Sequence, residues 1–273
     1  MARVDPRGLS GEAHGFRVLE RAARIVEMLA QAGRPLGVTE VARSLGLQKS
    51  TTHRLLTALT RVELVRGDVN TRRYTLGFRL LRWTAAWLDR LDVRTRALPH
   101  LQKLREKCQE TVSLSLRDGR GRVAVERLET AHELRFVVDL GNPAPLHVGA
   151  GGKAILAFLP EREAREILDA AGVRGRARGL LLRELAEVRR LGSSVTRGER
   201  VPGSGSVSAP VFNHEERAIG SVSILSLAVR MPEDVVRSHR ELVRQTADAV
   251  SRELGWRRET AIAAGDRRRR RGP

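Results

Sequence analysis

The clearest alternation of apolar and polar positions lies between residues 38 and 79. Two stretches, 38–45 and 50–62, carry apolar residues every three or four positions and are separated by Gly46, which predicts two helices joined by a tight turn. Apolar and polar residues then alternate on either side of the polar segment 67–72, which predicts a two-stranded hairpin. This order predicts a winged helix-turn-helix within residues 16–78, a fold that places its second helix in the major groove of DNA.

The second of these helices sorts its side chains onto two faces. Thr52, Leu55, Leu56, Leu59 and Val62 share the face that would pack on a core. The opposite face has no Asp or Glu and carries groups that can reach base edges and phosphates, whereas an ordinary solvated face mixes both signs of charge. The candidate DNA-binding residues on this helix and the hairpin are Lys49, Ser50, Thr51, His53, Arg54, Thr57, Arg61, Arg72 and Arg73.

Helical patterns flank the motif on both sides. An amphipathic helix is predicted over 16–31, and Glu40 follows Gly37 at the spacing of a capping-box acid. A linker helix is predicted within 79–93, and it carries Trp83 and Trp87. These tryptophans indicate burial, either on the protein's own core or in a dimer contact, and the sequence leaves both alternatives open.

From residue 94 the pattern changes to short alternating runs between helices. Runs with a period of two residues occur at 111–116, 123–125, 134–140, 206–212 and 218–227. Helices are predicted at 95–109, 152–159, 161–171, 183–191 and 232–256. We therefore expect an α+β domain on an antiparallel sheet over residues 94–256. The N-terminal segment 1–15 and the basic segment 257–273, which contains Arg267–Arg271, are predicted to be disordered tails.

Composition narrows the choice of partners and compartment. The chain has 273 residues, of which 41% are hydrophobic, enough for two globular domains. Its net charge of +18 favours an anionic partner, most often nucleic acid. A single cysteine excludes an intrachain disulfide and a cysteine-based zinc site. No secretion signal and no apolar stretch long enough for a membrane span are present, so a cytoplasmic protein is expected.

Two groups of motifs resemble one known family. The segment ARSLGLQKSTTHRLLTAL at 42–59, followed by Tyr-Thr-Leu-Gly at 74–77, resembles the DNA-binding domain of IclR-type bacterial transcriptional regulators. The segment 145–157, PLHVGAGGKAILA, resembles that family's Pro-Leu-His…Gly-Lys-Ala segment, and 192–199 with 206–213 resembles its effector-domain signature. The resemblance covers about residues 16–256.

This resemblance implies a winged helix, a linker helix and a GAF-like effector-binding domain. It also implies a homodimer, often a dimer of dimers, bound to a short palindrome in a promoter. The ligand-binding positions carried over from the family are Ala150, Gly151, Thr196, Ser204, Ser206 and Ser223. The chain departs from the family pattern in having Gln48 before the second helix, Glu63 where glycine is usual after it, and Thr196 where Asp or Ser is usual.

The residues themselves are compatible with a polar pocket. In a strand over 218–227 the period of two places Ser221, Ser223 and Leu225 on one face. Backbone N–H groups of 149–152 at a helix start, together with these hydroxyls, suit a small carboxylate. The alternative is that the serines are merely small, hydrogen-bonded sheet residues. Apart from Phe158 and Phe212 we expect no aromatic side chain nearby.

Other chemistries have weaker support. The segment 149–154 matches a dinucleotide-binding glycine pattern, but Pro143 and Pro145 precede it and no acid ends a following strand. Cys108 has no neighbouring histidine, and His147 is as compatible with a structural role as with a functional one. We therefore expect no enzyme, no metal and no cofactor. The expected function is a regulator that binds double-stranded DNA as a homo-oligomer and senses a small organic acid. The alternative is a small-molecule sensor or enzyme in which DNA binding is secondary.

Overall fold

The computed structural model of the chain describes residues 6–89 and 92–257, and it divides the chain into two units, Met1–Arg90 and Leu91–Pro273. The Arg267–Arg271 run and nearly all of the expected C-terminal tail lie outside the described residues. None of the helices within the described ranges combines the length and the apolarity that a bilayer crossing requires.

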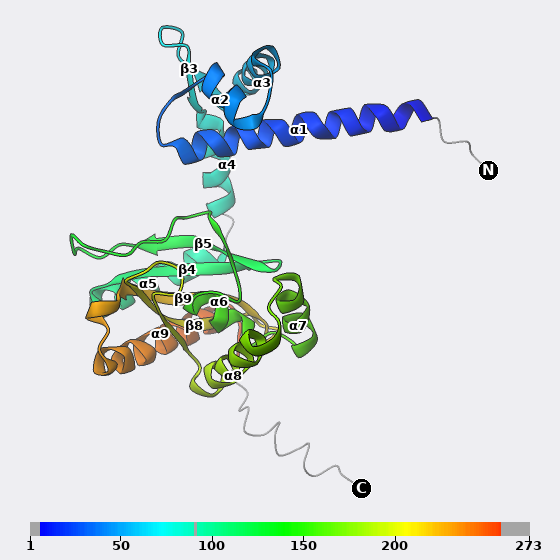
Figure 1. Ribbon diagram of the computed structural model, residues 1–273. Coiled ribbons are helices and arrows are strands. Elements are labelled where there is room, and N and C mark those ends of the chain that lie inside the picture. Colours follow the sequence, from blue (N-terminus) through cyan, green and yellow to red (C-terminus); the bar gives the residue numbers. More distant parts are fainter. Residues whose placement is uncertain (1–5, 90–91, 258–273) are drawn as a thin grey trace. The chain divides into compact units, whose positions relative to one another are not determined.

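The first unit is a winged helix-turn-helix (Figure 1). Its elements are α1 (Pro6–Ala32), β1 (Leu36–Gly37), α2 (Val38–Leu45), α3 (Lys49–Arg61), β2 (Val65–Gly67), β3 (Arg73–Leu76) and α4 (Phe78–Asp89). The three strands form an antiparallel sheet in the order β1–β3–β2. Ile25, Val41, Leu56, Leu59 and Val65 come from four elements and form its buried core. The predicted pair of helices and the hairpin are confirmed, and the two-residue strand β1 is an addition to them.

Two expectations for this unit are wrong. Helix α1 begins at Pro6 rather than Phe16, so residues 6–15 are helical where a disordered segment was expected. A polar helix leaves no apolar stripe in the sequence, so hydrophobic periodicity cannot reveal it. Val62 is 44% exposed instead of buried, because it follows the last residue of α3 and caps the helix with non-helical dihedral angles.

The second unit is built on one antiparallel sheet of six strands in the order β6–β5–β4–β9–β8–β7. Its strands are β4 (Thr111–Asp118), β5 (Gly121–Leu128), β6 (Pro143–Pro145), β7 (Ser194–Arg197), β8 (Ser204–Phe212) and β9 (Ala218–Leu227). Its helices are α5 (Asp92–Cys108), α6 (Ala150–Leu156), α7 (Glu161–Ala170), α8 (Gly175–Leu191) and α9 (Glu233–Glu253), with a 3₁₀ turn at Ala228–Arg230. The expected α+β class with an antiparallel sheet is therefore confirmed.

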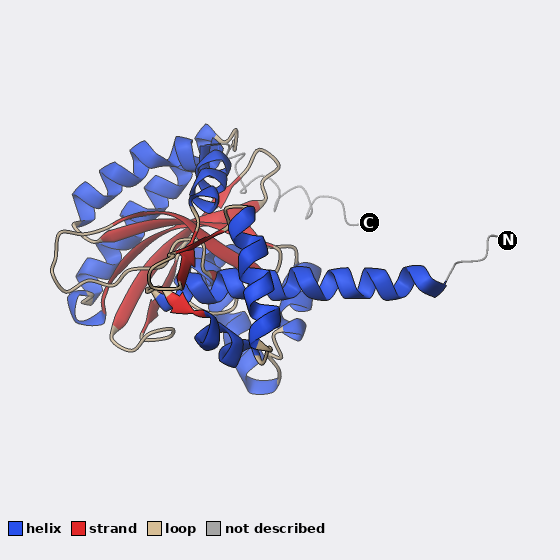
Figure 2. Cartoon of the chain, turned by 90° about the horizontal axis from the view of Figure 1, so that it is seen from above, coloured by secondary structure: helices blue, strands red, loops and turns tan. Residues whose placement is uncertain are grey.

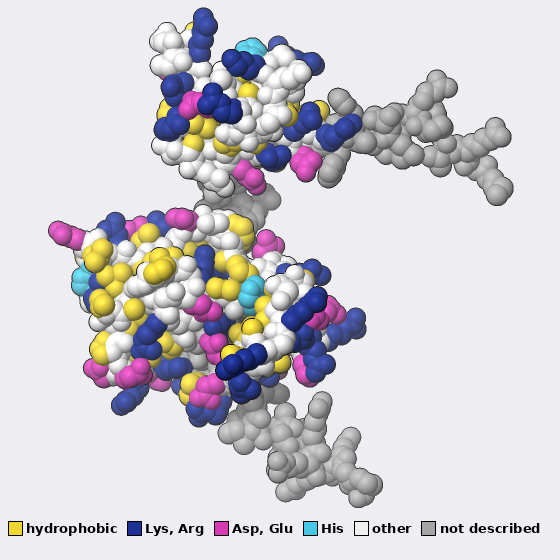
Figure 3. Space-filling model, viewed as in Figure 1, with side chains coloured by type: hydrophobic (Ala, Val, Ile, Leu, Met, Phe, Trp, Pro, Cys, Tyr) yellow, Lys and Arg dark blue, Asp and Glu magenta, His cyan; other side chains and the backbone are white. Residues whose placement is uncertain are grey.

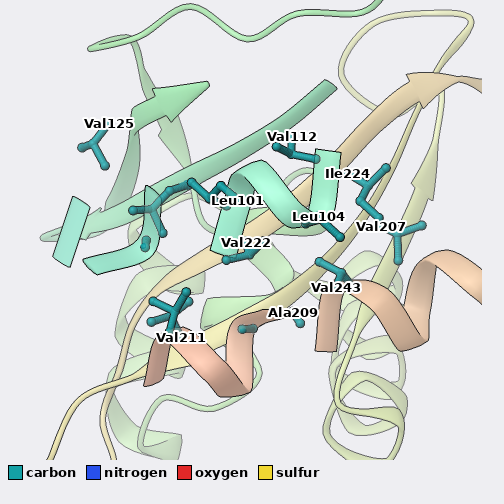
Figure 4. Close-up of a cluster of buried hydrophobic side chains, with 14 of the residues drawn as sticks. Leu101, Leu104, Val112, Val125, Val207, Ala209, Val211, Val222, Ile224 and Val243 are labelled. Carbon is teal, nitrogen blue, oxygen red and sulfur yellow. The ribbon is translucent and has the colours of Figure 1, made fainter. Parts of the chain in front are cut away.

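Helices cover the sheet in layers (Figure 2). On one face α5 and α9 bury the main core, in which Leu101, Leu104, Val112, Val222 and Val243 meet (Figure 4). On the other, α6 packs against β8 and β9, and a second apolar cluster joins α6, α7 and α8.

Alternation along the strands gives the two faces of the sheet opposite chemistry. On β9, Val222 and Ile224 belong to the main core, so Ser221 and Ser223 point to the face that α6 covers. The register continues this face across the sheet, because Ser223 lies opposite both Ser113 of β4 and Ser208 of β8. The α6 side of the sheet therefore carries rows of buried hydroxyl groups.

The strand expected at 134–140 is absent, and this prediction is wrong. The segment is a connection between β5 and β6, and its carbonyl groups accept hydrogen bonds from arginines instead of from a neighbouring strand. Arg127 Nη1 donates to the Val138 carbonyl at 2.6 Å, and Arg230 Nη1 donates to the Leu134 carbonyl at 3.1 Å. Helix α8 also begins at Gly175 instead of residue 183.

Candidate functional site

Local hydrogen bonds fix helix α3 in its place. Gly46 ends α2 in the left-handed conformation at φ 64°, as predicted, and Glu40 accepts a 2.8 Å hydrogen bond from the Gly37 amide, as a capping acid should. Thr52 is fully buried, and its hydroxyl donates to the Gln48 carbonyl at 3.1 Å. Gln48 itself makes no side-chain cap, in agreement with the weak cap that the sequence predicts.

The predicted DNA-reading side chains lie along one side of α3. Lys49, Ser50, His53, Arg54 and Arg61 are exposed, whereas Thr51 and Thr57 are half-buried. An open groove lies between α3 and the wing, and six of the predicted residues line it: Lys49, Ser50, His53, Thr57, Arg61 and Arg72. Gly67, Val69 and Tyr74 are among the other residues of its lining. Figure 3 shows basic side chains and a histidine gathered at this end of the unit.

The two wing arginines have different surroundings. Asp68 holds the tip by accepting 2.8 Å hydrogen bonds from the amides of Asn70 and Thr71, and the bond from Thr71 lowers the pKa of this carboxyl group. Arg72 is exposed at the end of the tip, with φ 54°. Arg73 instead donates to the Pro35 carbonyl at 3.0 Å and lies 3.4 Å from Glu40. Arg72 is therefore the wing arginine that is better placed to meet a phosphate.

In the second unit, all six predicted ligand-binding residues line one cavity. Ala150 and Gly151 come from α6, Thr196 from β7, Ser204 and Ser206 from β8, and Ser223 from β9. Gly149, Ser113, Leu225 and four further residues complete the lining. The centre of a water-sized sphere can move through about 40 Å³ of this cavity, which limits an occupant to a small molecule.

Two backbone N–H groups expected to be open to a carboxylate are already bonded. The Gly149 amide donates to Glu199 Oε2 at 3.2 Å, and the Ala150 amide donates to the Thr196 hydroxyl at 3.2 Å. The expectation of free donors is wrong at these two positions, because side chains from the β7–β8 region satisfy the start of α6. The helix start therefore adds less attraction for an anion than the sequence suggests.

The serines keep polar groups in the cavity. The Ser208 hydroxyl donates to the Ser223 hydroxyl at 2.7 Å, and Ser206 lies 3.4 Å from Ser208. The Ser204 hydroxyl is already used, since it donates to the Val201 carbonyl at 2.6 Å. Gly151 must stay small, because a Cβ there would lie 3.0 Å from the Ser221 oxygen and 3.2 Å from the Ser223 oxygen.

Sequence reasoning missed two arginines that line the cavity, Arg122 and Arg200. Arg122 is only 7% exposed, and burial, together with the positive charge of Arg200, lowers its pKa to about 10. A signal was available for Arg122, since the period of two places it on the opposite face of β5 from Val123. Arg200 lies in the loop after β7, where no periodicity applies.

The aromatic surroundings also differ from expectation. Phe136 and Val138 of the β5–β6 connection line the cavity, so an aromatic side chain is present after all. Phe158 and Phe212 do not line it. They pack edge to face at 5.3 Å, and Phe212 stacks on Trp256 at 5.2 Å.

An ion network around the buried Lys153 side chain connects α6 with two glutamates. Lys153 of α6 lies 2.9 Å from Glu184 of α8 and 2.8 Å from Glu199, and its side chain is 7% exposed. Glu199 thus contacts both the Lys153 ammonium group and the Gly149 amide. This network ties the loop that carries Arg200 to the helix that begins at the cavity.

Two other candidate residues from the sequence, Cys108 and His147, do not line this cavity. Burial raises the pKa of the Cys108 thiol to about 11, which disfavours the nucleophilic thiolate. His147 is half-buried and does not line the cavity. Within residues 6–89 and 92–257 no cluster of three or more His, Cys, Asp or Glu side chains could hold a metal ion.

Comparisons with known proteins match both units of the chain. The model of the IclR helix-turn-helix domain matches residues 18–69, and that of the bacterial transcriptional regulator IclR C-terminal domain matches residues 85–252. The HTH-type transcriptional repressor AllR of Escherichia coli strain K12 is 30% identical over 266 residues, covering 93% of this chain and 98% of AllR.

Solved structures show the same arrangement of elements. The IclR structure from Thermotoga maritima has a TM-score of 0.75 at 27% sequence identity, and the match covers 88% of this chain and 100% of the Thermotoga maritima chain. HmgR from Pseudomonas aeruginosa has a TM-score of 0.71 at 28% sequence identity, and the match covers 88% of this chain and 100% of the HmgR chain.

Proposed function

Because the chain belongs to the IclR family of bacterial transcriptional regulators, it is a DNA-binding regulator and not an enzyme, and we propose that it binds a promoter palindrome as a homodimer or dimer of dimers under the control of a small organic acid. Its site of action is then the cytoplasm, where bacterial DNA lies. Helix α3 reads base edges in the major groove, and Arg72 contacts the phosphate backbone beside it.

The observation that carries the DNA-binding part of the proposal is the chemistry of the α3 surface. Apart from Ala58, its exposed side chains are cationic or hydrogen-bonding. Those of Lys49, His53, Arg54 and Arg61 form no ion pair with a described carboxylate. Cations that are not neutralised within the protein are available to the phosphates and bases of a duplex.

Substitution of Arg54 tests this assignment. Arg54→Ala is expected to cost about 1–3 kcal/mol in binding to the native promoter while changing non-specific binding little, because a base contact supports specificity. Arg162→Ala on α7 removes the same charge from the other unit, where Arg162 only pairs with Glu166, and serves as the control. Fluorescence anisotropy with promoter and scrambled duplexes measures both. Normal promoter selectivity of Arg54→Ala would contradict the role of α3.

The cavity supports the effector part of the proposal. Hydroxyl groups from several strands and two arginines converge on a space that fits a small molecule, and a carboxylate is the group that such donors bind best. The AllR relatives are repressors by name. We therefore propose that this chain represses its promoter and that the effector releases it.

Ser206 and Ser223 test the effector site. Ser206→Val replaces a hydroxyl of the cavity by a methyl group and adds a second methyl group, and it should weaken effector-induced release of DNA while leaving affinity in the absence of effector unchanged. Ser223→Val should act in the same direction and more strongly, because it also removes the acceptor of the Ser208 hydroxyl. Effector titrations followed by anisotropy measure this. If both variants released DNA as the wild type does, the effector would not bind in this cavity.

The alternative function, a sensor or enzyme with secondary DNA binding, predicts a different result. It requires chemical turnover of the bound molecule by the purified protein. Incubation of stabilising organic acids with the protein, followed by mass spectrometry, would detect conversion if that alternative held.

A further inference from the structure

Two guanidinium groups share the cavity without a carboxylate to neutralise them. The side chains meet over Gly149, where an added Cβ would lie 3.1 Å from Arg200 Cδ and 3.4 Å from Arg122 Nη2. Arg122 comes from β5 and is buried, whereas Arg200 comes from the loop after β7 and is exposed. Arg122 therefore belongs to the buried part of the lining and Arg200 to its exposed part.

Arg122 is poorly satisfied by the protein. Its only hydrogen bond to a described residue joins Nη1 to the Ser115 hydroxyl at 3.4 Å, and its Nε atom is buried without a described partner. A buried cation without a counter-ion destabilises a protein unless a ligand supplies the opposite charge.

The neighbouring acids are engaged elsewhere. Glu199, next to Arg200 in sequence, contacts Lys153 and the Gly149 amide. The two buried carboxylates of this unit also have other partners, since Glu126 pairs with Arg94 at 2.8 Å and Glu110 pairs with Arg230 at 2.7 Å. Among the described residues, no ion pair neutralises Arg122 or Arg200.

An apolar wall faces the charged pair. Phe136, Val138 and Leu225 line the same cavity, so a short carbon chain can lie against them while charged groups at its ends meet the arginines.

We propose that the effector is a short dicarboxylate, one carboxylate bound by Arg122 in the buried part of the lining and the other by Arg200 in its exposed part. This inference rests on the proposed function, in which an organic acid occupies this cavity. It adds the number of charges and the two residues that recognise them. A dianion balances both guanidinium groups, whereas a monocarboxylate leaves one of two like charges uncompensated.

Matched pairs of acids test the charge of the ligand. Malonate is compared with propionate and succinate with butyrate at equal ionic strength, by isothermal titration calorimetry on the full chain. At least one dicarboxylate should bind about tenfold or more tightly than its monocarboxylate partner. Equal affinity within both pairs would overturn the dicarboxylate inference but leave an organic-acid regulator intact.

Two arginine variants test the residues. Arg200→Gln should reduce the preference for the dicarboxylate to about twofold or less, because only the outer contact is lost. Arg122→Gln should abolish binding of both acids over the measured range. Arg120→Gln, an exposed arginine outside the cavity, is the control for net charge and should keep the wild-type preference.

A thermal readout separates recognition from a structural role. Without ligand, Arg122→Gln should raise Tm by about 2–4 °C, because it removes a buried, uncompensated charge. A fall in Tm together with unchanged dicarboxylate binding would mark Arg122 as structural and overturn the proposal. Binding of neutral compounds only, with release of promoter DNA, would instead refute the organic-acid part of the proposed function.

Discussion

At the scale of single residues, one position with a left-handed backbone, Glu63, is also a departure from the family pattern. Glu63 follows α3 in the left-handed conformation at φ 60°, where the family resemblance leads us to expect glycine. The backbone still closes the helix, because the Leu64 amide donates to the Leu59 carbonyl at 3.0 Å. A residue with a Cβ in this region costs about 1 kcal/mol relative to glycine.

Glu63→Gly should therefore stabilise the winged-helix unit by about 1 kcal/mol. The substitution also removes an ion pair with Arg82, but both side chains are more than 60% exposed, so that loss is small. Urea denaturation followed by circular dichroism measures the change. Glu63→Ala loses the same ion pair and keeps the strained backbone, so a gain as large as that of glycine would contradict the argument.

At the scale of elements, helix α6 depends on a charge at its buried side. Lys153 joins it to α8 and to the β7–β8 loop through two carboxylates. Lys153→Met would leave Glu184 and Glu199 near each other without the cation between them. Because these glutamates are 39% and 31% exposed, solvent reduces the penalty below that of a fully buried pair.

We expect Lys153→Met to lower the free energy of unfolding by about 2–3 kcal/mol and to weaken effector binding, because Glu199 also bonds the Gly149 amide. Arg162→Met, which breaks only the exposed pair with Glu166, should cost about 0.5 kcal/mol or less. Urea denaturation of both variants provides the comparison. Equal losses of unfolding free energy in the two variants would show that the Lys153 network stabilises the protein no more than the exposed Arg162–Glu166 pair does.

The elements also show how far sequence reasoning reaches. The alternation of Ser221, Val222, Ser223 and Ile224 was enough to assign the faces of β9, since one face must pack on a core. The same alternation at 134–140 led to a wrong strand prediction. Phe136 and Val138 of this segment line a cavity, and the segment pairs with no strand. Arg200 could not be predicted, since its approach to Arg122 depends on the path of a loop.

At the scale of the whole molecule, exposed apolar residues of α4 are the basis for the proposed self-association. Phe78 and Leu81 share a face of the helix, three positions apart, and are 68% and 64% exposed. Trp83 lies on another side, is 54% exposed, and has the guanidinium of Arg79 5.2 Å from its ring centre. The side chain of Trp87 lies outside the described residues. Large exposed apolar residues on a helix favour burial against a second copy, which is also what a palindromic site requires.

Phe78→Glu combined with Leu81→Glu should weaken the proposed dimer about tenfold or more and lower affinity for the palindrome, because like charges would face each other across the two-fold axis. Sedimentation velocity over a concentration series measures the association. Arg162→Glu, a charge reversal on the other unit, controls for net charge. A dimer that withstands the double substitution would place the interface elsewhere on the protein.

The alternating strands of the second unit have a consequence for how such regulators diversify. The residues that form the main core and those that line the proposed effector cavity occupy alternate positions of the same strands, as with Val222 and Ser223. A substitution at a cavity position does not change a residue of the main core. Selection can therefore alter which metabolite is recognised without compensating mutations that restore stability. A lineage can then acquire a new inducer through a few substitutions at positions such as 113, 122, 200 and 206, with its operator recognition unchanged.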